Sequence, residues 1–437
     1  MPTFKITTLG CKVNQCESDA ISSSLKKNGW ADPETEEKSD LCIINTCAVT
    51  GKASMQSRQA IRKLIRENPN AKIIVTGCAA QIEEKEIAKI KGVHHIIPHP
   101  DKQNIPDLIF LTDGKPETSP SGYGGESFPK KTSDLLTHTP AGKRTRPFLK
   151  VQDGCNSFCS YCVVPYSRGR SRSMPADQVI SHLNHLAQAG YHEVVLTGIH
   201  LGVYGLDLNP ATTLFELLRN ILKSSPIERL RLSSIEPGEL SDDLIHLVSD
   251  SSVLCDHFHI PLQSGDDTIL TSMGRPYSAS LFEDRVYKIK KMLPDAGIGT
   301  DILAGFSGET EKQFLNTVEL IEKLPISYLH VFPFSPRKGT AAYSFKNRVP
   351  DSEVRKRSMT LRALGKKKRL SFFEKAVGQT REILIETQRD ANTGLLKGLS
   401  TNYIQVLVDG PDDLKNSIRQ IRLARVVNDY SIYGAEL

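Results

Sequence analysis

This chain of 437 residues contains no long hydrophobic run. None of its apolar segments approaches the roughly 20 residues that a helix needs to cross a bilayer, so we expect no membrane partner. The opening residues, MPTFKITTLG, lack a charged segment followed by an apolar one, which predicts that no secretory signal is present and that the protein is cytoplasmic. In that compartment nine Cys residues indicate metal or catalytic chemistry and not disulfide staples.

A strong charge of one sign is also absent. The formal net charge is +6, a modest basic excess that suggests a polyanionic partner but is too small to identify one. Hydrophobic residues make up 39% of the chain, which is enough for ordinary buried cores. The length is typical of about two to four domains.

A fourth Cys is missing from the most compact cysteine motif. Cys155, Cys159 and Cys162 lie in the run GCNSFCSYC, and no other Cys is near them in the sequence. Three thiolates at this spacing can bind three corners of a cubane iron-sulfur cluster, which leaves the fourth iron open to a small chelating ligand. The main alternative is a zinc site, although zinc normally takes four ligands and commonly uses paired C-x-x-C elements. A structural disulfide set is a weaker alternative.

A second trio of cysteines is dispersed over the first eighty residues. Cys11, Cys47 and Cys78 follow the strand-like segments FKITTLG, LCIINT and KIIVTG, and helix-compatible stretches come after them at 18–27, 53–67 and 83–90. This alternation predicts a parallel sheet covered on both faces, whose strands all end at one edge. The three Cys residues should therefore converge on a second cluster. We interpret Cys16, Cys42 and Cys255 as buried core residues, because none of them has a partner at metal-ligand spacing.

From Pro147 the strand and helix alternation resumes. Six strand-like segments separated by helices predict a partial or complete (β/α) barrel, with its functional edge at the carboxyl ends of the strands. The candidate cofactor contacts at those ends are Thr197, Gly198, Ser233, Ser234, Glu236 and Gln263. Ordinary turns are the alternative interpretation for each of these residues. The stretch before the barrel is rich in Gly, Pro, Ser, Thr and Lys and is interpreted as a linker.

Several motifs resemble one known family. GCNSFCSYCVVPYSRGRSRS is similar to the radical S-adenosylmethionine (SAM) motif of the methylthiotransferases, and GCKVNQCESD, NTCAVT and TGCAAQ are similar to their amino-terminal domain. The resemblance covers nearly the whole chain, and it implies an α/β protein in three domains. These are an amino-terminal parallel-sheet methylthiotransferase domain (1–111), a radical SAM partial (β/α) barrel (141–372) after a linker (112–140), and a small TRAM-like β-barrel (373–437).

The resemblance also implies cofactors and a mechanism. One 4Fe-4S cluster would bind SAM through its open iron and be held by Cys155, Cys159 and Cys162. An auxiliary 4Fe-4S cluster would be held by Cys11, Cys47 and Cys78. In the family, one SAM donates a methyl group to sulfur at the auxiliary cluster, and a second is cleaved to a radical that takes hydrogen from the substrate carbon, so that a methylthio group replaces that hydrogen. Tyr161 would support the cluster loop or the adenine, with packing alone as the alternative.

The carboxy-terminal segment points to RNA. The strand-like runs after Val377 resemble the small β-barrel that ends many tRNA-modifying enzymes, and barrels of this kind commonly bind oligonucleotides. Residues 377–437 contain slightly more acidic than basic residues, so phosphate affinity should come mainly from elsewhere. The candidates are two basic runs, Arg168, Arg170 and Arg172 beside the compact cysteines and Lys366, Lys367 and Lys368 before the barrel. A solvated helix face is the alternative for the lysines.

Within the family, NTCAVT, GRSRS and TGIHLGVYG look most like the enzymes that methylthiolate carbon 2 of N6-threonylcarbamoyladenosine at position 37 of tRNA. The sister groups act on isopentenyladenosine at the same position or on an aspartate of a ribosomal protein. A cluster-bearing RNA-binding protein without catalysis is an alternative of a different class. The resemblance implies a monomer whose partners are a tRNA anticodon stem-loop and an electron donor such as flavodoxin or ferredoxin.

Overall fold

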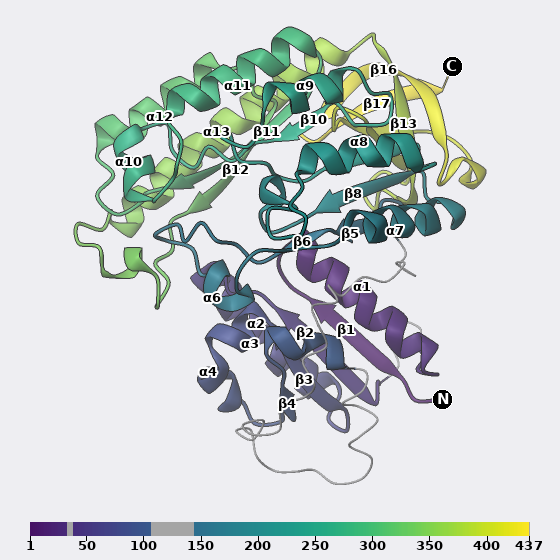
Figure 1. Cartoon of the computed structure of the whole chain (residues 1–437), viewed down its shortest axis with the longest axis vertical. Coiled ribbons are helices and arrows are strands. Elements are labelled where there is room, and N and C mark those ends of the chain that lie inside the picture. Colours follow the sequence, from purple (N-terminus) through teal and green to yellow (C-terminus); the bar gives the residue numbers. More distant parts are fainter. Residues whose placement is uncertain (33–37, 106–143, 437) are drawn as a thin grey trace. The chain divides into compact units, whose positions relative to one another are not determined.

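The structure, a computed structural model, describes residues 1–32, 38–105 and 144–436. The linker expected at 112–140 lies outside these residues. The chain divides into two compact units, and each is described by itself (Figure 1). Unit 1 comprises Met1–Gly142, Phe148–Met174 and Ser335–Tyr343, and unit 2 comprises the rest of the chain. Over the described ranges, no helix has both the length and the apolar character needed to cross a membrane.

Unit 1 is built around a four-stranded parallel sheet in the order β1-β2-β3-β4. Its inner strands are buried on both faces, because Ile43 packs with α1 residues on one side and Ile44 packs with α2 residues on the other. The predicted sheet covered on both faces is therefore confirmed. The elements are β1 (Phe4–Thr8), α1 (Lys12–Lys27), β2 (Leu41–Thr46), α2 (Gly51–Glu67), β3 (Lys72–Gly77), α3 (Cys78–Ile82), α4 (Glu84–Ala88), β4 (His95–Ile96) and the 3-10 helix η1 (His99–Asn104).

The rest of unit 1 carries the compact cysteine motif. The motif lies in the loop that follows β6, and β6 pairs antiparallel with β7. A short helix follows the motif and ends at Arg168. The elements of this part are β5 (Phe148–Lys150), β6 (Gln152–Asp153), α6 (Val164–Arg168), β7 (Arg172–Ser173) and the 3-10 helix η3 (Ala341–Ser344), of which all but the last residue belongs to unit 1.

Unit 2 contains the remaining strands of the predicted (β/α) barrel, in sequence order and with parallel pairing. The backbone of Leu230 on β9 bonds to Val253 and Cys255, which links the β8-β9 pair to the segment that leads into β10. All six strand segments predicted from the sequence are strands, with β5 as the first. The elements are α7 (Ala176–Gln188), β8 (Glu193–Thr197), η2 (Leu201–Val203), α8 (Leu214–Ser224), β9 (Arg229–Leu232), α9 (Asp242–Ser249), β10 (His257–His259), α10 (Asp267–Ser272), α11 (Ala279–Met292), β11 (Gly297–Ala304), α12 (Glu311–Lys323) and β12 (Tyr328–Pro333).

A long helix leads from the last of these strands into a small closed barrel. The barrel has the strand order β13-β14-β15-β17-β16 and a core of aliphatic side chains that includes Ile383, Val406 and Ile421. Sequence reasoning found four of its strands and missed β17, which closes the barrel between β15 and β16. The elements are α13 (Asp351–Ala376), β13 (Thr380–Arg389), β14 (Leu396–Ser400), β15 (Gln405–Val408), η4 (Asp412–Leu414), β16 (Ile418–Asn428) and β17 (Ser431–Glu436).

The loop between β14 and β15 packs against the amino ends of the parallel strands of unit 2. The Tyr403 ring stacks on the His257 ring at the start of β10, with 4.3 Å between ring centroids. The Arg231 guanidinium donates hydrogen bonds to the carbonyl oxygens of Thr401 (2.7 Å) and Ser400 (3.0 Å). At Gly297, which begins β11, a Cβ atom would lie 2.1 Å from the carbonyl oxygen of Asn402, so only glycine fits there. This loop therefore closes the amino-terminal end of the strands.

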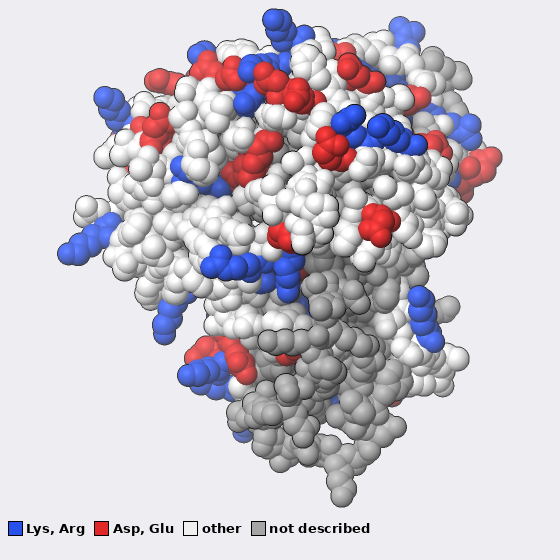
Figure 2. Space-filling view, in the orientation of Figure 1, with Lys and Arg blue, Asp and Glu red and all other residues white. Residues whose placement is uncertain are grey.

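Charges of both signs alternate on the visible face of unit 2. Figure 2 shows Lys and Arg side chains interspersed with Asp and Glu side chains over the region where Figure 1 places α9 and α11. Ion pairs such as Lys288 with Asp242 (3.0 Å) join these helices. The basic excess of the chain is therefore not gathered on this face.

Candidate active site

The three dispersed cysteines follow three neighbouring parallel strands, at one edge of the sheet. Cys11 precedes α1 as its N-cap residue, Cys47 follows β2 directly, and Cys78 is the first residue of α3 directly after β3. Burial raises the pKa of Cys47 to about 11, and the nearby Cys78 and Cys11 add to this rise. The three cysteines therefore lie at the same edge of the sheet, each at the end of a strand.

Two glycines allow this close approach. Gly10 has φ +101°, and a Cβ atom there would lie 2.9 Å from Cβ and 3.1 Å from Sγ of Cys47. Gly77 has φ +96°, and a Cβ atom there would lie 2.4 Å from the carbonyl oxygen of Thr46. Any other residue at these positions would be strained in its backbone and would clash. The glycines before Cys11 and Cys78 therefore shape the cysteine site.

The compact trio lies on a loop held by backbone hydrogen bonds. The amide of Cys155 donates to the carbonyl of Gly169 (3.1 Å), and the amide of Cys162 donates to that of Cys159 (2.9 Å). Cys159 is buried, whereas Cys155, Cys162 and the intervening Tyr161 are partly exposed. The loop thus carries all three cysteines, and a ligand can reach the two that are partly exposed.

A fully buried group of charged side chains connects the elements that carry the two trios. The Glu17 carboxylate on α1 accepts from Lys102 (2.5 Å), Lys150 (3.0 Å) and Arg168 (2.9 Å). Asp153 accepts from Lys150 (3.2 Å) and Arg168 (2.8 Å). All five side chains are at most 3% exposed. We call these five residues the buried ion cluster. Sequence reasoning missed four of them.

The buried ion cluster carries a net positive charge beside the cysteines. Three cationic residues face two carboxylates, and burial lowers the pKa of the neighbouring His99 to about 4, so that this imidazole is neutral at pH 7. Although burial opposes it, Glu17 and Asp153, followed by Cys78 and Cys11, raise the pKa of Arg168 well above its usual value. Arg168 is therefore near these two cysteines. A positive group at this place favours thiolate ligands over neutral thiols.

This burial corrects the expectation that Arg168 contacts RNA. Its side chain is 1% exposed, and it pairs with Glu17 and Asp153, so no phosphate can reach it in this structure. Arg170 is exposed, and Arg172 is partly exposed with its guanidinium 4.0 Å from Asp153.

The lysines before the small barrel differ among themselves. Lys366 lies 3.5 Å from Asp429, and Lys367 is exposed. The Lys368 ammonium donates to the carbonyl oxygens of Glu322 and Leu324, both at 2.7 Å, and burial lowers its pKa. Lys368 therefore fixes α13 against the end of α12, which makes it a poorer candidate for RNA than its two neighbours.

The predicted cofactor residues of unit 2 lie at or just after the carboxyl ends of its strands. Thr197 is the last residue of β8 and Gly198 follows it, Ser233 and Ser234 follow β9, and Gln263 follows β10. Gln263 has φ +64°, and its backbone bonds to Asp301 and Leu303 of β11. Its main chain therefore extends the edge where ligands of such folds bind.

Two of these residues have a buried polar atom that makes no hydrogen bond to any residue that the structure describes. The Oγ of Ser233 and the Oε2 of Glu236 are buried, and within residues 1–32, 38–105 and 144–436 neither has a hydrogen-bond partner. The other carboxylate oxygen of Glu236 accepts from Arg275 at 2.8 Å, and burial raises the pKa of Glu236. Buried polar groups without partners are costly. Their presence at the strand ends fits a polar ligand that bonds to them.

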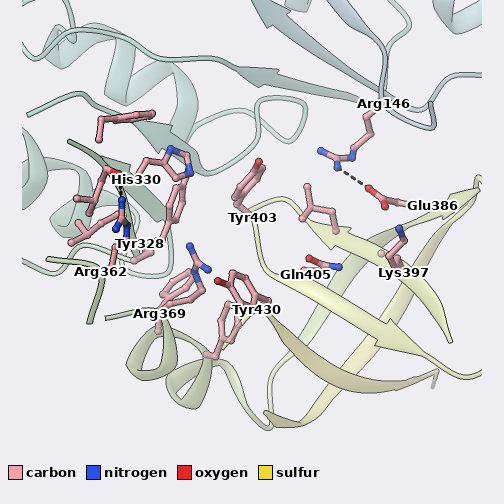
Figure 3. A pocket seen from close by; sticks show the side chains of 18 residues that line it. Arg146, Tyr328, His330, Arg362, Arg369, Glu386, Lys397, Tyr403, Gln405 and Tyr430 are labelled. Atoms are coloured by element: carbon pink, nitrogen blue, oxygen red, sulfur yellow. Dashed lines mark hydrogen bonds and ion pairs between the residues drawn. The ribbon is translucent and has the colours of Figure 1, made fainter. Parts of the chain in front are cut away.

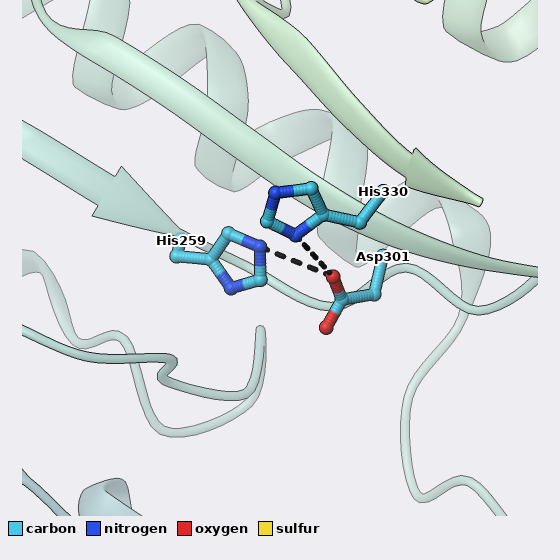
Figure 4. A group of neighbouring side chains, drawn as sticks. All are labelled: His259, Asp301 and His330. Atoms are coloured by element: carbon cyan, nitrogen blue, oxygen red, sulfur yellow. Dashed lines mark hydrogen bonds and ion pairs between the residues drawn. The ribbon is translucent and has the colours of Figure 1, made fainter. Parts of the chain in front are cut away.

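Sequence reasoning also missed a group of three side chains on adjacent strands. His259 on β10, Asp301 on β11 and His330 on β12 point toward one another (Figure 4). The Asp301 carboxylate lies 3.2 Å from Nε2 of His259 and 3.1 Å from Nδ1 of His330, and Ser234 contacts the other ring nitrogen of His259 at 2.6 Å. Asp301 therefore fixes the orientation of both imidazole rings. The sequence held a usable signal for the two histidines. His259 in HFHI and His330 in YLHV each lie two positions after another ring-bearing residue, and residues at such spacing share one face of a strand.

Comparisons with known proteins agree with this arrangement. Residues 3–98 match the family described as Uncharacterized protein family UPF0004, and residues 149–321 match the Radical SAM superfamily. The chain is 35% identical over 436 residues to the threonylcarbamoyladenosine tRNA methylthiotransferase MtaB of Bacillus subtilis, with 99% of this chain and 96% of that protein covered. The chain belongs to the radical SAM methylthiotransferase family.

Other relatives of this radical SAM methylthiotransferase bear two names. The protein named MtaB of Aquifex aeolicus is 36% identical, with 94% of this chain and 98% of that protein covered. The tRNA-2-methylthio-N(6)-dimethylallyladenosine synthase of Clostridium botulinum is 32% identical, with 99% and 97% covered. Among solved structures, the radical SAM methyltransferase TsrM from Kitasatospora setae has a TM-score of 0.54 at 15% identity, with 76% of this chain and 75% of that chain covered, and shares the fold.

The cofactors of the family are 4Fe-4S clusters and SAM, and the donor sets in the structure suit them. Each trio offers three sulfur ligands, and the glycine before Cys11 leaves no space for a side chain next to Cys47. Thiolates are the usual protein ligands of such clusters. The unpartnered oxygens of Ser233 and Glu236 suit a ligand with hydrogen-bond donors.

Proposed function

We propose that this methylthiotransferase acts on tRNA and adds a methylthio group to carbon 2 of N6-threonylcarbamoyladenosine at position 37. The observation that carries the proposal is the presence, within one compact unit, of two cysteine trios on elements joined by the buried ion cluster. A radical SAM enzyme that only cleaves SAM would need one such trio. Relatives named for this substrate, at 35% and 36% identity over most of the chain, support the choice of nucleoside.

In this proposal each trio holds one cluster, with Cys155, Cys159 and Cys162 for the first and Cys11, Cys47 and Cys78 for the second. When bound, the first cluster and SAM would supply a carbon-centred radical, and the second cluster would hold the sulfur that is transferred. The chain contributes placement: Gly10 leaves room for Cys47, Gly77 leaves room for the backbone of Thr46, and Arg168 balances the negative charge of the thiolates. Binding and orientation are the usual contribution of protein in cofactor enzymes.

Strand-end residues of unit 2 complete the proposed cofactor contacts. Ser233 and Glu236 offer buried oxygens to the polar groups of SAM, and Thr197, Gly198, Ser234 and Gln263 line the same strand ends. Tyr161 supports the cluster loop or the adenine ring. Arg170, Arg172, Lys366 and Lys367 are the remaining candidates for phosphate contacts. We further propose that the protein is a cytoplasmic monomer. It would receive electrons from a donor such as flavodoxin or ferredoxin.

The second candidate substrate is the dimethylallyl (isopentenyl) adenosine at the same position. It is favoured by the 32% identity to the synthase of Clostridium botulinum, which extends over nearly the whole chain. The substituents differ in polarity, because a threonylcarbamoyl group carries a carboxylate whereas a dimethylallyl group is apolar.

Mass spectrometry of tRNA nucleosides tests the proposal and separates the candidates. Cells without this protein should lack methylthiolated threonylcarbamoyladenosine, and the wild-type gene should restore it. A Cys159→Ser variant should fail to restore it. A Cys255→Ser variant is the matched control, because Cys255 is a buried core residue of unit 2 and should be dispensable for chemistry. Loss of only the dimethylallyl product, or an unchanged nucleoside profile, would refute the proposal.

A further inference from the structure

A cavity of about 780 Å³ lies within unit 2 between β12, α13 and the small barrel (Figure 3). Pockets that hold small ligands typically measure about 300–1,000 Å³. The cavity is lined by residues from all three of these elements, so it exists only because the small barrel packs against the rest of unit 2. Its charged Lys, Arg, Asp and Glu residues are Arg146, Arg362, Arg369, Lys397 and Glu386.

The charges of the cavity favour an anionic ligand. Four of these residues are cationic and one is acidic. The Arg146 guanidinium lies 2.7 Å from the Glu386 carboxylate, so these two charges largely offset each other. Arg362, Arg369 and Lys397 remain as an excess of positive charge. Lys and Arg side chains at this density are typical of phosphate contacts.

Aromatic rings accompany these cations. The Arg369 guanidinium lies 5.7 Å from the ring centroid of Tyr328 and 5.0 Å from that of Tyr430. Figure 3 shows Arg369 beside Tyr430, with Tyr403 farther from them. Tyr430 is 61% exposed and Phe332 is 43% exposed, so a ligand in the cavity can reach both rings.

Several other residues of the cavity wall have fixed surroundings. Tyr328 stacks on Tyr403 with 5.7 Å between ring centroids, and Asp301 orients His330, which also lines the cavity. The Arg362 guanidinium is 3.4 Å from the carbonyl oxygen of Val331. A preformed wall of this kind lowers the ordering cost of binding.

We infer that this cavity binds one unpaired nucleotide of the RNA substrate, with its base stacked on Tyr430 and its phosphate held by Arg369, Arg362 and Lys397. Recognition of single-stranded RNA combines base stacking on aromatic or Arg planes with cationic contacts to the backbone. The inference rests on the proposed function insofar as the substrate is RNA. It adds a second point of contact, at which a nucleotide other than the one being modified is held.

The test uses the full-length protein and a fluorescently labelled anticodon stem-loop. Tyr430→Ala should weaken binding by about 5- to 150-fold, the range found when one base-stacking ring is removed, whereas Tyr430→Phe should bind like wild type because the ring is kept. Tyr287→Ala is the matched control, since Tyr287 is a similarly exposed tyrosine on α11 and is not part of the cavity wall. Tyr430 is largely exposed, so its loss should leave the fold intact.

The cations are tested through the salt dependence of the same binding. Arg362→Gln should lower the slope of log affinity against log salt concentration by about 0.7, the value expected for one lost phosphate contact on a single strand. The inference is overturned if Tyr430→Ala binds the stem-loop as tightly as wild type. It is also overturned if both Tyr430→Ala and Tyr287→Ala weaken binding equally, or if the slope for Arg362→Gln is unchanged.

Failure of this inference is distinguishable from failure of the proposed function. If the wild-type protein methylthiolates tRNA and Tyr430→Ala binds the stem-loop equally well, the proposed function stands and the role of the cavity is refuted. If the wild-type protein binds RNA through the cavity but does not change the nucleoside profile, the role of the cavity stands and the proposed function is refuted. Preferential binding of a protein or peptide at the cavity, with no effect of Tyr430→Ala on RNA, also overturns the inference.

Discussion

Removal of the charge of Glu17 should destabilise unit 1 strongly. This carboxylate is 0% exposed and accepts from three buried cations, Lys102, Lys150 and Arg168. Glu17→Gln preserves the size of the side chain but leaves Lys150 and Arg168 paired with Asp153 alone and removes the carboxylate that pairs with Lys102. Loss of one partner from a buried ion pair costs about 3–5 kcal/mol, a large part of the about 5–15 kcal/mol that stabilises a typical folded domain. At about 2–4 °C per kcal/mol, we expect Tm to fall by about 6–20 °C.

The single tryptophan makes this measurement specific to unit 1. Trp30 is the only Trp of the chain and packs against the core formed by β1, β2 and α1, so its fluorescence during urea denaturation reports the unfolding of that unit. The control is Glu228→Gln, the same substitution at a 57% exposed carboxylate that pairs with His192. That exposed pair should contribute about 0–1 kcal/mol.

A compensating variant separates charge imbalance from other damage. Lys102→Met added to Glu17→Gln removes one of the uncompensated cations, so the double variant should be more stable than Glu17→Gln alone. The reasoning about the buried ion cluster is refuted if Glu17→Gln costs no more than Glu228→Gln. It is equally refuted if the double variant loses the sum of the two single effects.

Three further outcomes are expected. Gly10→Ala should lower the iron content of the protein because its Cβ atom would lie 2.9 Å from Cβ of Cys47. Gly29→Ala is the control, since this glycine has φ +82° and open space around it, and it should leave the iron content unchanged. Equal iron in both variants would contradict the role assigned to Gly10. Cys47→Ala should retain SAM cleavage, measured as 5′-deoxyadenosine, and lose methylthiolation, and retained methylthiolation would remove Cys47 from the proposed ligands. Hydrogen bonds from His259 and His330 outweigh burial and lower the pKa of Asp301, so its carboxylate should stabilise unit 2 above about pH 4 and lose this effect as the pH falls below that value. The difference in unfolding free energy between wild type and Asp301→Asn should therefore shrink as the pH falls below about 4; a difference that grows over that range would contradict this sign.

Much of the fold follows from local sequence patterns. The strands that precede Cys47 and Cys78 are nearly continuous apolar runs, as expected for a parallel sheet buried on both faces, and the six strand segments of the (β/α) barrel are recognisable for the same reason. The helix α1 begins at Lys12, earlier than the predicted start at 18. The prediction missed its first turns because they carry polar residues such as Asn14 and Glu17, which are typical of a loop in sequence although they are buried in the structure. β17 is short and contains Gly434, which weakens its strand pattern.

The buried ion cluster could not be predicted, because its members are distant in sequence and of a type that usually lies at the surface. Glu17 and Arg168 are 151 positions apart. A charged residue on a helix normally faces solvent, and only the folded arrangement of α1, β5 and α6 shows that these side chains pair. The same reason explains the misinterpretation of Arg168, whose neighbours in sequence, Arg170 and Arg172, are at least partly exposed.

The insertion of residues 400–403 beneath the strands of unit 2 has a consequence for how this enzyme can be engineered. Because Tyr403 stacks on His257 and the backbone of Asn402 fills the space left by Gly297, the small barrel supplies part of the floor of the larger one. It cannot swing on α13 as an independent arm without opening that floor. A chimaera that receives its barrel from another family member should therefore keep its stability only when the donor loop also fits Arg231, His257 and Gly297, and a graft that ignores this fit should destabilise the whole of unit 2.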